Sequence, residues 1–127
     1  IFKNNELMLY FAFGSNMNPD RMRQREVNFT SRVRAVLEGY TLKFNKVSRN
    51  NPVKAFANIV PKEDGIVEGV LYEMPAEDIK KIDRAEGAPK HYKRIRVTVH
   101  LDDGSKVEAD TYIAQPEWIR EGIRPDR

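Results

Sequence analysis

Two segments near the end of the chain alternate between apolar and polar residues with a period of two. Residues 95–101 and 107–113 each place an apolar or small side chain at every second position, and residues 102–105, Asp-Asp-Gly-Ser, lie between them. This alternation is typical of strands with one face in a core, and the intervening residues favour a tight reversal. The chain therefore builds at least one β-hairpin with a buried face.

A second strand signal lies near the start of the chain. Residues 7–13 form a continuous apolar run that ends at Gly14. Such a run predicts a strand buried on both faces, in a central position of the sheet. Shortly after it, Asn18, Pro19 and Asp20 supply an N-cap, a proline suited to the first helical position and an acid for the first turn, so we expect a short helix from Pro19.

The middle of the chain carries further strand patterns. We expect extended structure over 32–47, a loop over 48–52, and two strands over 55–60 and 66–74, separated by a turn at 61–65 that contains proline and glycine. Strands thus outnumber helices and are joined mostly by turns. This order favours a single α+β domain over residues 1–127, with a mixed, strongly curled sheet of about six strands that can close into a barrel.

A helix is predicted from Pro75 to residue 85 or 86, with Gly87 placed to cap its end. Ile79, Ile82 and Glu86 stand at i, i+3 and i+7, so the carboxyl group of Glu86 projects from the same face as the two isoleucines. Burial and the C-terminal end of the helix dipole would both raise its pKa. A carboxyl group tuned in this way suits proton transfer.

A structural role for Glu86 is the alternative, and periodicity leaves it open. In that case Glu86 would lie at the helix edge and form hydrogen bonds with Lys90, Tyr92 or Arg94. The neighbouring acid, Asp83, falls at the flank of the helix, where Arg84 or Lys80 could neutralise it.

The loop Gly14-Ser15-Asn16 is the second feature that could carry chemistry. A glycine that leaves a buried strand can take a positive φ, and the backbone N–H groups after it can converge on a carboxylate or an oxyanion. The side chains of Ser15 and Asn16 add donors. By themselves, however, three residues of this kind more often form a plain turn.

Composition excludes several classes of site. The 127 residues include no cysteine and two histidines, so thiolate chemistry is excluded and a histidine metal site is disfavoured. No apolar stretch approaches the length of about 20 residues that crosses a bilayer, so we expect a cytoplasmic protein without membrane contact. The net charge of +3 neither demands nor excludes nucleic acid.

Other polar and aromatic residues have simpler interpretations. We expect the basic clusters to be solvated faces, the histidines to lie at the surface, Tyr72 and Tyr112 to be core residues with a bonded hydroxyl, and Trp118 to anchor the tail. The basic clusters are Arg21, Arg23 and Arg25, and Lys90, Lys93, Arg94 and Arg96.

Residues 10–16, Tyr-Phe-Ala-Phe-Gly-Ser-Asn, are followed about seventy residues later by Ile-Asp-Arg-Ala-Glu-Gly at 82–87. The pair resembles the YFAYGSN and LDxxEG motifs of the γ-glutamylcyclotransferase-like family. The resemblance implies a small mixed β-barrel with flanking helices and an enzyme that releases 5-oxoproline and a free amine from a γ-glutamyl-amine. It needs no cofactor or metal, assigns proton transfer to Glu86, and assigns substrate binding to Tyr10, Phe11, Ala12, Phe13, Gly14, Ser15 and Asn16.

The chain departs from the family pattern in two places. Phe13 stands where the family has a tyrosine, so one hydroxyl is lost beside the loop. Family members also continue beyond Arg127, and we expect that a C-terminal segment of the domain is missing from this sequence. The identity of the leaving amine, and whether the protein is a monomer or a homodimer, are not determined by the sequence.

Two competing interpretations use the same fold without catalysis. A small basic β-barrel could hold single-stranded nucleic acid on exposed aromatic residues. Tyr40, Phe44 and Tyr72 lie in phase with aliphatic neighbours such as Leu42, which predicts that they point inward and disfavours this role. Alternatively, the pocket could carry a small ligand without converting it, for which an inward acid such as Glu86 would be an awkward feature.

Overall fold

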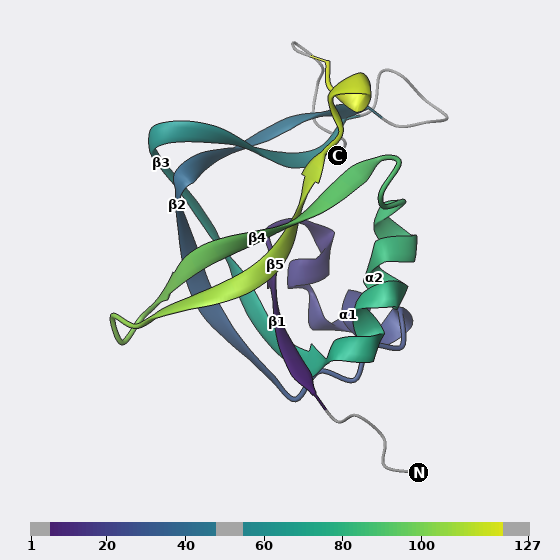
Figure 1. Ribbon diagram of the computed structural model, residues 1–127, viewed down its shortest axis with the longest axis vertical. Helices are drawn as coiled ribbons and strands as arrows, with labels where there is room; N and C mark the ends of the chain where they lie inside the picture. Colours follow the sequence, from purple (N-terminus) through teal and green to yellow (C-terminus); the bar gives the residue numbers. More distant parts are fainter. Residues whose placement is uncertain (1–5, 48–54, 121–127) are drawn as a thin grey trace.

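The computed structural model describes residues 6–47 and 55–120, so the loop predicted over 48–52 lies outside the described residues. Within these ranges five strands close into a barrel in the order β1-β3-β2-β4-β5 (Figure 1). The α+β barrel is therefore confirmed, with five strands in place of about six. The strands are β1 (Leu7–Ala12), β2 (Ser31–Val47), β3 (Ala55–Pro75), β4 (Tyr92–Leu101) and β5 (Lys106–Ala114).

The predicted hairpin and the predicted central strand are both present. Strands β4 and β5 pair antiparallel along their length, with Val99 opposite Val107, and Gly104 takes a φ of +87° in the turn between them. Strand β1 lies between β3, with which it is antiparallel, and β5, with which it is parallel. The single parallel contact makes the sheet mixed and closes the barrel.

The turn predicted at residues 61–65 is wrong, because β3 runs through it as one continuous strand. Strand β3 pairs with β2 on both sides of this segment, and the pairing register shifts between Glu38 and Tyr40. A Cβ on Gly65 would lie 2.3 Å from the carbonyl oxygen of Tyr40, so glycine allows the two backbones to approach at this point. Proline and glycine here mark a bulge and a bend within a strand, which sequence patterns do not distinguish from a turn.

The expected inward orientation of residues near the end of β2 is also corrected. Leu42 and Phe44 are 40% and 41% exposed, whereas Lys46 is 5% exposed. A second register shift falls between Phe44 and Lys46, and it changes which residues face the core. Tyr40 is half-buried and packs against the core cluster inside the barrel.

Both predicted helices are present. Helix α1 (Pro19–Gln24) follows the 3₁₀ turn η1 (Ser15–Met17), and the Asn18 side chain caps α1 by accepting a hydrogen bond from the Asp20 N–H at 2.9 Å. The second helix begins as the 3₁₀ turn η2 (Ala76–Asp78), continues as α2 (Ile79–Glu86) and ends at Gly87, whose φ is 69°. A further 3₁₀ turn, η3 (Pro116–Trp118), follows β5. Figure 1 shows α2 along one side of the barrel, with the β4–β5 turn projecting on the opposite side.

Two hydrophobic clusters share strand β1. Phe11 belongs to the cluster inside the barrel, to which all five described strands contribute. Tyr10 and Ala12 belong to the other cluster, together with Met22 and Ile82 from the two helices. The alternation of side chains along β1 thus joins the barrel to its helices and explains why the apolar run has no polar face.

Candidate active site

A cavity of about 880 Å³ opens between the barrel and the two helices. It is lined by segments from both ends of the chain: the end of β1, η1, α1, the outer parts of β2 and β3, the end of α2, and β4 and β5. Its size suits a small-molecule ligand. The chemically functional side chains on its wall are Tyr10, Ser15, Asn16, Arg21, Arg25, Lys46, Arg84, Glu86, His91, Tyr92 and Tyr112.

Glu86 and Asn16 meet at this cavity. The Asn16 Nδ2 atom donates to Glu86 Oε1 at 3.0 Å and lies 3.0 Å from the Tyr10 hydroxyl oxygen. Asn16 is 2% exposed, whereas Glu86 is half-buried. The two motifs, 70 residues apart in the chain, are therefore joined by a direct hydrogen bond, and the alternative partners Lys90, Tyr92 and Arg94 are not the ones Glu86 uses here.

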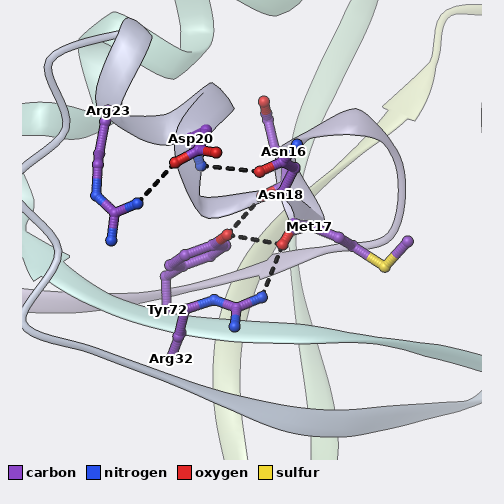
Figure 2. A network of polar contacts seen from close by, with 7 residues as sticks. All are labelled: Asn16, Met17, Asn18, Asp20, Arg23, Arg32 and Tyr72. Carbon is purple, nitrogen blue, oxygen red and sulfur yellow. Dashed lines mark hydrogen bonds and ion pairs between the residues drawn. The ribbon is translucent and has the colours of Figure 1, made fainter.

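The turn that carries Asn16 is held from below by β2 and β3. Figure 2 shows the Tyr72 hydroxyl between the Asn16 and Met17 carbonyl oxygens, which lie 2.7 and 3.0 Å away. A guanidinium nitrogen of Arg32 also donates to the Met17 oxygen, at 2.8 Å (Figure 2). Tyr72 is fully buried, as predicted for a core residue with a bonded hydroxyl. These contacts fix the loop before any ligand binds.

Gly14 differs from its predicted conformation. Its φ is −120°, so the loop is not built on a left-handed glycine. The chain turns instead through η1, in which the Met17 N–H donates to the Gly14 oxygen at 3.0 Å. A Cβ at Gly14 would lie 3.4 Å from the Ala57 side chain, which faces the same cavity.

The pKa of Glu86 reflects opposing influences. Burial raises the pKa of this carboxyl group above its ordinary value, whereas Arg25, Lys46 and the hydrogen bond from Asn16 lower it. Burial prevails, so the net shift is upward. Glu86 can therefore exchange a proton closer to neutral pH than an exposed glutamate.

Three tyrosine hydroxyls around the cavity stay protonated at neutral pH. Burial raises the pKa of Tyr10 and of Tyr92, and the nearby Glu86 carboxylate raises both further. Burial likewise raises the pKa of Tyr112, whose hydroxyl donates to Asp83 at 2.5 Å. Asp83 also lies 3.6 Å from Arg94, so its partners are not the predicted Arg84 and Lys80.

The residues predicted to bind substrate fall into two groups. Tyr10, Phe13, Gly14, Ser15 and Asn16 line the cavity. The remaining two residues, Phe11 and Ala12, are fully buried in the two core clusters and do not line it.

The sequence analysis missed several cavity residues, because their local sequence patterns are those of solvent-exposed positions. Arg21 and Arg25 line the cavity, although we expected their cluster to be solvated; Arg23 is exposed and pairs with Asp20 at 2.8 Å. His91 lines it as well, whereas His100 Nε2 lies 3.3 Å from the Glu38 carboxylate and is not among the lining residues. The positions of Arg21 and Arg25 depend on how α1 packs against the barrel, for which the sequence has no periodic signal.

Lys46 is the missed residue with the most distinctive surroundings. Its ammonium nitrogen lies 3.0 Å from His91 Nδ1 and 5.2, 5.5 and 5.8 Å from the ring centroids of Trp118, Tyr92 and Phe56. The His91 and Trp118 rings stack at 4.2 Å, which confirms a packing role for Trp118. The register shift after Phe44 turns Lys46 inward, and no local pattern announces a bulge.

A second hollow, of about 750 Å³, lies on the outer face of β2 and β3. Its charged residues already have partners, because Arg34 bridges Glu68 and Asp102, and Arg32 donates to the Met17 oxygen. Over the described ranges, no group of three or more His, Cys, Asp and Glu side chains is arranged to hold a metal ion. None of the helices in those ranges has the length and apolar character needed to traverse a bilayer.

The closed mixed barrel thus brings the half-buried Glu86 and the loop hydrogen-bonded to it to the wall of one cavity of a size that suits a small molecule. The chain belongs to the family described as gamma-glutamyl cyclotransferase, AIG2-like, which it matches over residues 10–126. The match confirms the resemblance read from the two motifs, and the family is one of enzymes that act on γ-glutamyl compounds.

Individual relatives agree with the family. The gamma-glutamylcyclotransferase of Bos taurus is 26% identical over 114 residues, which cover 87% of this chain and 61% of that protein. A Methanocaldococcus jannaschii protein, named as a candidate gamma-glutamylcyclotransferase, is 34% identical over 62 residues, 45% of this chain and 52% of its own length. The chain thus spans between about half and three fifths of these relatives.

Solved structures confirm the fold. One described as a gamma-glutamyl cyclotransferase superposes with a TM-score of 0.76 at 24% identity, over 89% of this chain and 74% of that one.

Proposed function

We propose that this protein is a γ-glutamylcyclotransferase, which converts a γ-glutamyl-amine into 5-oxoproline and a free amine with Glu86 as the general base and acid. The observation that carries the proposal is the hydrogen bond between Glu86 and Asn16 at the wall of a cavity large enough for a glutamyl group. Family membership supports the reaction class. The geometry supports the role of Glu86.

The reaction uses the substrate's own amine as nucleophile. Glu86 takes a proton from the α-ammonium group, and the freed nitrogen attacks the γ-carbonyl carbon to close a five-membered ring. Glu86 then returns the proton to the departing nitrogen as the carbon–nitrogen bond breaks. The ring nitrogen loses a second proton as the lactam forms, and the released amine takes up a proton to become an ammonium ion. Two protons thus pass from the attacking nitrogen to the departing nitrogen by way of Glu86, so the reaction balances without a cofactor, a nucleophilic side chain or water.

The loop Gly14-Ser15-Asn16 would bind the glutamyl end. Gly14, Ser15 and Asn16 line the cavity together with Glu86. Their backbone N–H groups and the Ser15 side chain would hold the α-carboxylate or the developing oxyanion. Holding the substrate in a ring-closing shape can lower the barrier by about 7–11 kcal/mol in favourable cases. Proton transfer by a positioned side chain contributes a factor of about 10² to 10⁴ more.

The surroundings of Glu86 suit both halves of this role. Its raised pKa brings the carboxyl group closer to the neutral range, where it can gain and lose a proton with little cost. Asn16 Nδ2 fixes one carboxylate oxygen, which leaves the other to face the substrate. Two tyrosines hold Asn16 in turn: its Nδ2 atom also donates to the Tyr10 hydroxyl oxygen, and the Tyr72 hydroxyl donates to its carbonyl oxygen.

The products distinguish cyclisation from its alternatives. We expect the protein, incubated with γ-glutamyl-alanine, to release 5-oxoproline and alanine in equal amounts, as measured by liquid chromatography and mass spectrometry. Release of glutamate would show hydrolysis by water instead. Bound but unchanged substrate would identify a ligand carrier, and either result would contradict the proposal.

A further inference from the structure

Asp83 is an acid of the segment 82–87 that the proposed reaction does not use. It lies on α2 three residues before Glu86, and its two carboxylate oxygens contact two different strands. Asp83 Oδ1 accepts a hydrogen bond from the Tyr112 hydroxyl on β5 at 2.5 Å, and Oδ2 lies 3.6 Å from the guanidinium of Arg94 on β4. Arg94 and Tyr112 are directly opposite each other in the pairing of β4 with β5, so one carboxylate holds a cross-strand pair.

Both partners of Asp83 are themselves held in place. Tyr112 is 2% exposed, and Arg94 Nε lies 3.7 Å from Asp110 Oδ2, so the Arg94 guanidinium is shared by two carboxylates. Asp110 also accepts a hydrogen bond from Arg96 Nε at 2.9 Å. Hydrogen bonds to a carboxylate are about twice as strong as those between neutral groups. The last turn of α2 is therefore fixed to the β4–β5 hairpin at Asp83.

A series of contacts leads from Asp83 back to Glu86. The Tyr112 ring meets the Tyr10 ring edge-on, with the centroids 5.8 Å apart. The Tyr10 hydroxyl oxygen accepts from Asn16 Nδ2, which also donates to Glu86 Oε1, each at 3.0 Å. The same helical turn is thus held at two points, by β4 and β5 at Asp83 and by η1 at Glu86.

The place of Glu86 in its helix makes this second attachment important. Glu86 is the last residue of α2, and Gly87 follows in a left-handed conformation. Helix ends fray, because their last carbonyl groups have no partners within the helix. A loose last turn would let the Glu86 carboxyl group leave Asn16, and the Asp83 contacts oppose this movement.

We infer that Asp83 is a positioning residue, which holds the last turn of α2 against Arg94 and Tyr112 so that the Glu86 carboxyl group stays on Asn16 and faces the substrate. The inference rests on the proposed function, in which Glu86 moves the proton. Asp83 is not among the described residues that line the cavity, so its effect reaches the reaction through the groups that it holds.

Kinetics separate this role from substrate binding. Asp83→Ala should lower kcat for γ-glutamyl-alanine by about 10- to 100-fold, because a misplacement of about 1 Å can cost about 10²-fold in rate. KM should stay within about threefold of the wild-type value, because the loop that binds the glutamyl end is unchanged. A folded Asp83→Ala protein with the wild-type kcat, or with a raised KM alone, would show that the inference is wrong.

Two arginines of β4 supply a milder variant and its control. Arg94→Met removes one of the two Asp83 contacts from the barrel surface and should lower kcat in the same direction by a smaller factor. It decides the question if Asp83→Ala does not fold. Arg96→Met removes a more exposed arginine that pairs with Glu108 and Asp110, and it should keep the wild-type kcat.

The side-chain amide of Asn16 reports the position of Glu86 without turnover. In ¹⁵N-labelled protein, its N–H signals are those missing from the nuclear magnetic resonance spectrum of Asn16→Ser. Glu86→Ala shows where these signals lie without the hydrogen bond. Asp83→Ala and Arg94→Met should move them toward the Glu86→Ala positions.

This measurement also keeps the inference separate from the proposed function. If no 5-oxoproline forms with the wild-type protein but the Asn16 amide signals respond to Asp83→Ala, the proposed reaction fails and the positioning role stands. A role in stability alone would lower the free energy of unfolding and leave these signals of the folded protein in place. Unchanged signals in the folded Asp83→Ala and Arg94→Met proteins would therefore refute the inference.

Discussion

At Glu86 two opposing influences act on one carboxyl group. Burial favours its neutral form, whereas Arg25, Lys46 and Asn16 favour the carboxylate. Tyr10 and Tyr92 also lie close enough for the Glu86 charge to affect their hydroxyl groups. Burial thus makes the carboxylate form unfavourable enough to accept a proton readily. The two cations and Asn16 stabilise it enough for the group to act as a base.

This balance predicts the pH dependence of the reaction. A base with a raised pKa loses its function as pH falls through that pKa, so kcat/KM should decline on the acid side at a pH above 4.5, the ordinary value for glutamate. Arg25→Met removes a cation that lowers the pKa and should move this decline to higher pH. A pH–rate profile measures it, with Arg23→Met, which removes an exposed arginine of the same helix, as the control. A decline that stays in place or moves to lower pH would contradict the assignment.

The sequence indicates the two residues that meet at the site but not the cations around them. Glu86 is recoverable because helical periodicity places it beside Ile82, and Asn16 because it follows a buried strand and a glycine. Lys46 and Arg25 are not recoverable in this way. Lys46 faces the cavity because of a register shift, and Arg25 because of how α1 packs, and both depend on contacts between distant segments.

At the scale of the elements, α2 delivers Glu86 through its C-terminal end. Gly87 ends the helix with a φ of 69°, and its N–H donates to the Arg84 oxygen at 3.2 Å. The next turn brings His91 against the same residue, with the His91 N–H donating to the Gly87 oxygen at 2.8 Å. The cap therefore positions the Glu86 carboxyl group and His91, the partner of Lys46, together.

Gly87→Ala should weaken this arrangement. The left-handed conformation costs a residue with a Cβ about 1–2 kcal/mol, and here the Cβ would also lie 2.9 Å from His91 Cδ2. We expect a loss of unfolding free energy above that for Gly104→Ala, where φ is +87° but no atom lies within 4 Å of the added Cβ. Urea unfolding compares the two variants. Equal losses would show that the contact with His91 relaxes freely.

The sequence predicts a helix or strand correctly where a single local pattern determines its position and type. The β4–β5 hairpin and the cap of α2 follow from alternation and from a single glycine. The turn at residues 61–65 was wrong because proline and glycine serve both turns and bulges, and the choice is made by the partner strand. Strand β3 continues because β2 is long enough to pair with both of its halves.

For the whole molecule, the two core clusters have different tasks. The cluster inside the barrel holds the strands together, and the other one attaches the helices that carry Glu86 and Arg25 to the cavity. Strand β1 contributes to both, so its interior residues should matter for stability more than for binding. The motif that includes Phe11 and Ala12 therefore combines cavity residues with core residues.

Phe11→Ala should be strongly destabilising. Phe11 is fully buried in the barrel interior, and truncation of such a ring costs about 3–5 kcal/mol. Ile66→Ala, at a position that is 60% exposed, should cost less than about 1 kcal/mol. Chemical denaturation measures both. Phe11→Leu, which keeps most of the volume, should retain the wild-type KM, and a large rise in KM would instead place Phe11 in substrate binding.

The central claim is that Glu86 moves the proton in the cyclisation of a γ-glutamyl-amine. Glu86→Gln keeps the shape of the side chain and an oxygen for Asn16, but it removes the titratable group. Release of 5-oxoproline from γ-glutamyl-alanine should fall by a factor of about 10² to 10⁴, while Glu77→Gln, on the exposed start of the same helical segment, should match the wild type. A folded Glu86→Gln protein with wild-type kcat/KM would contradict the account.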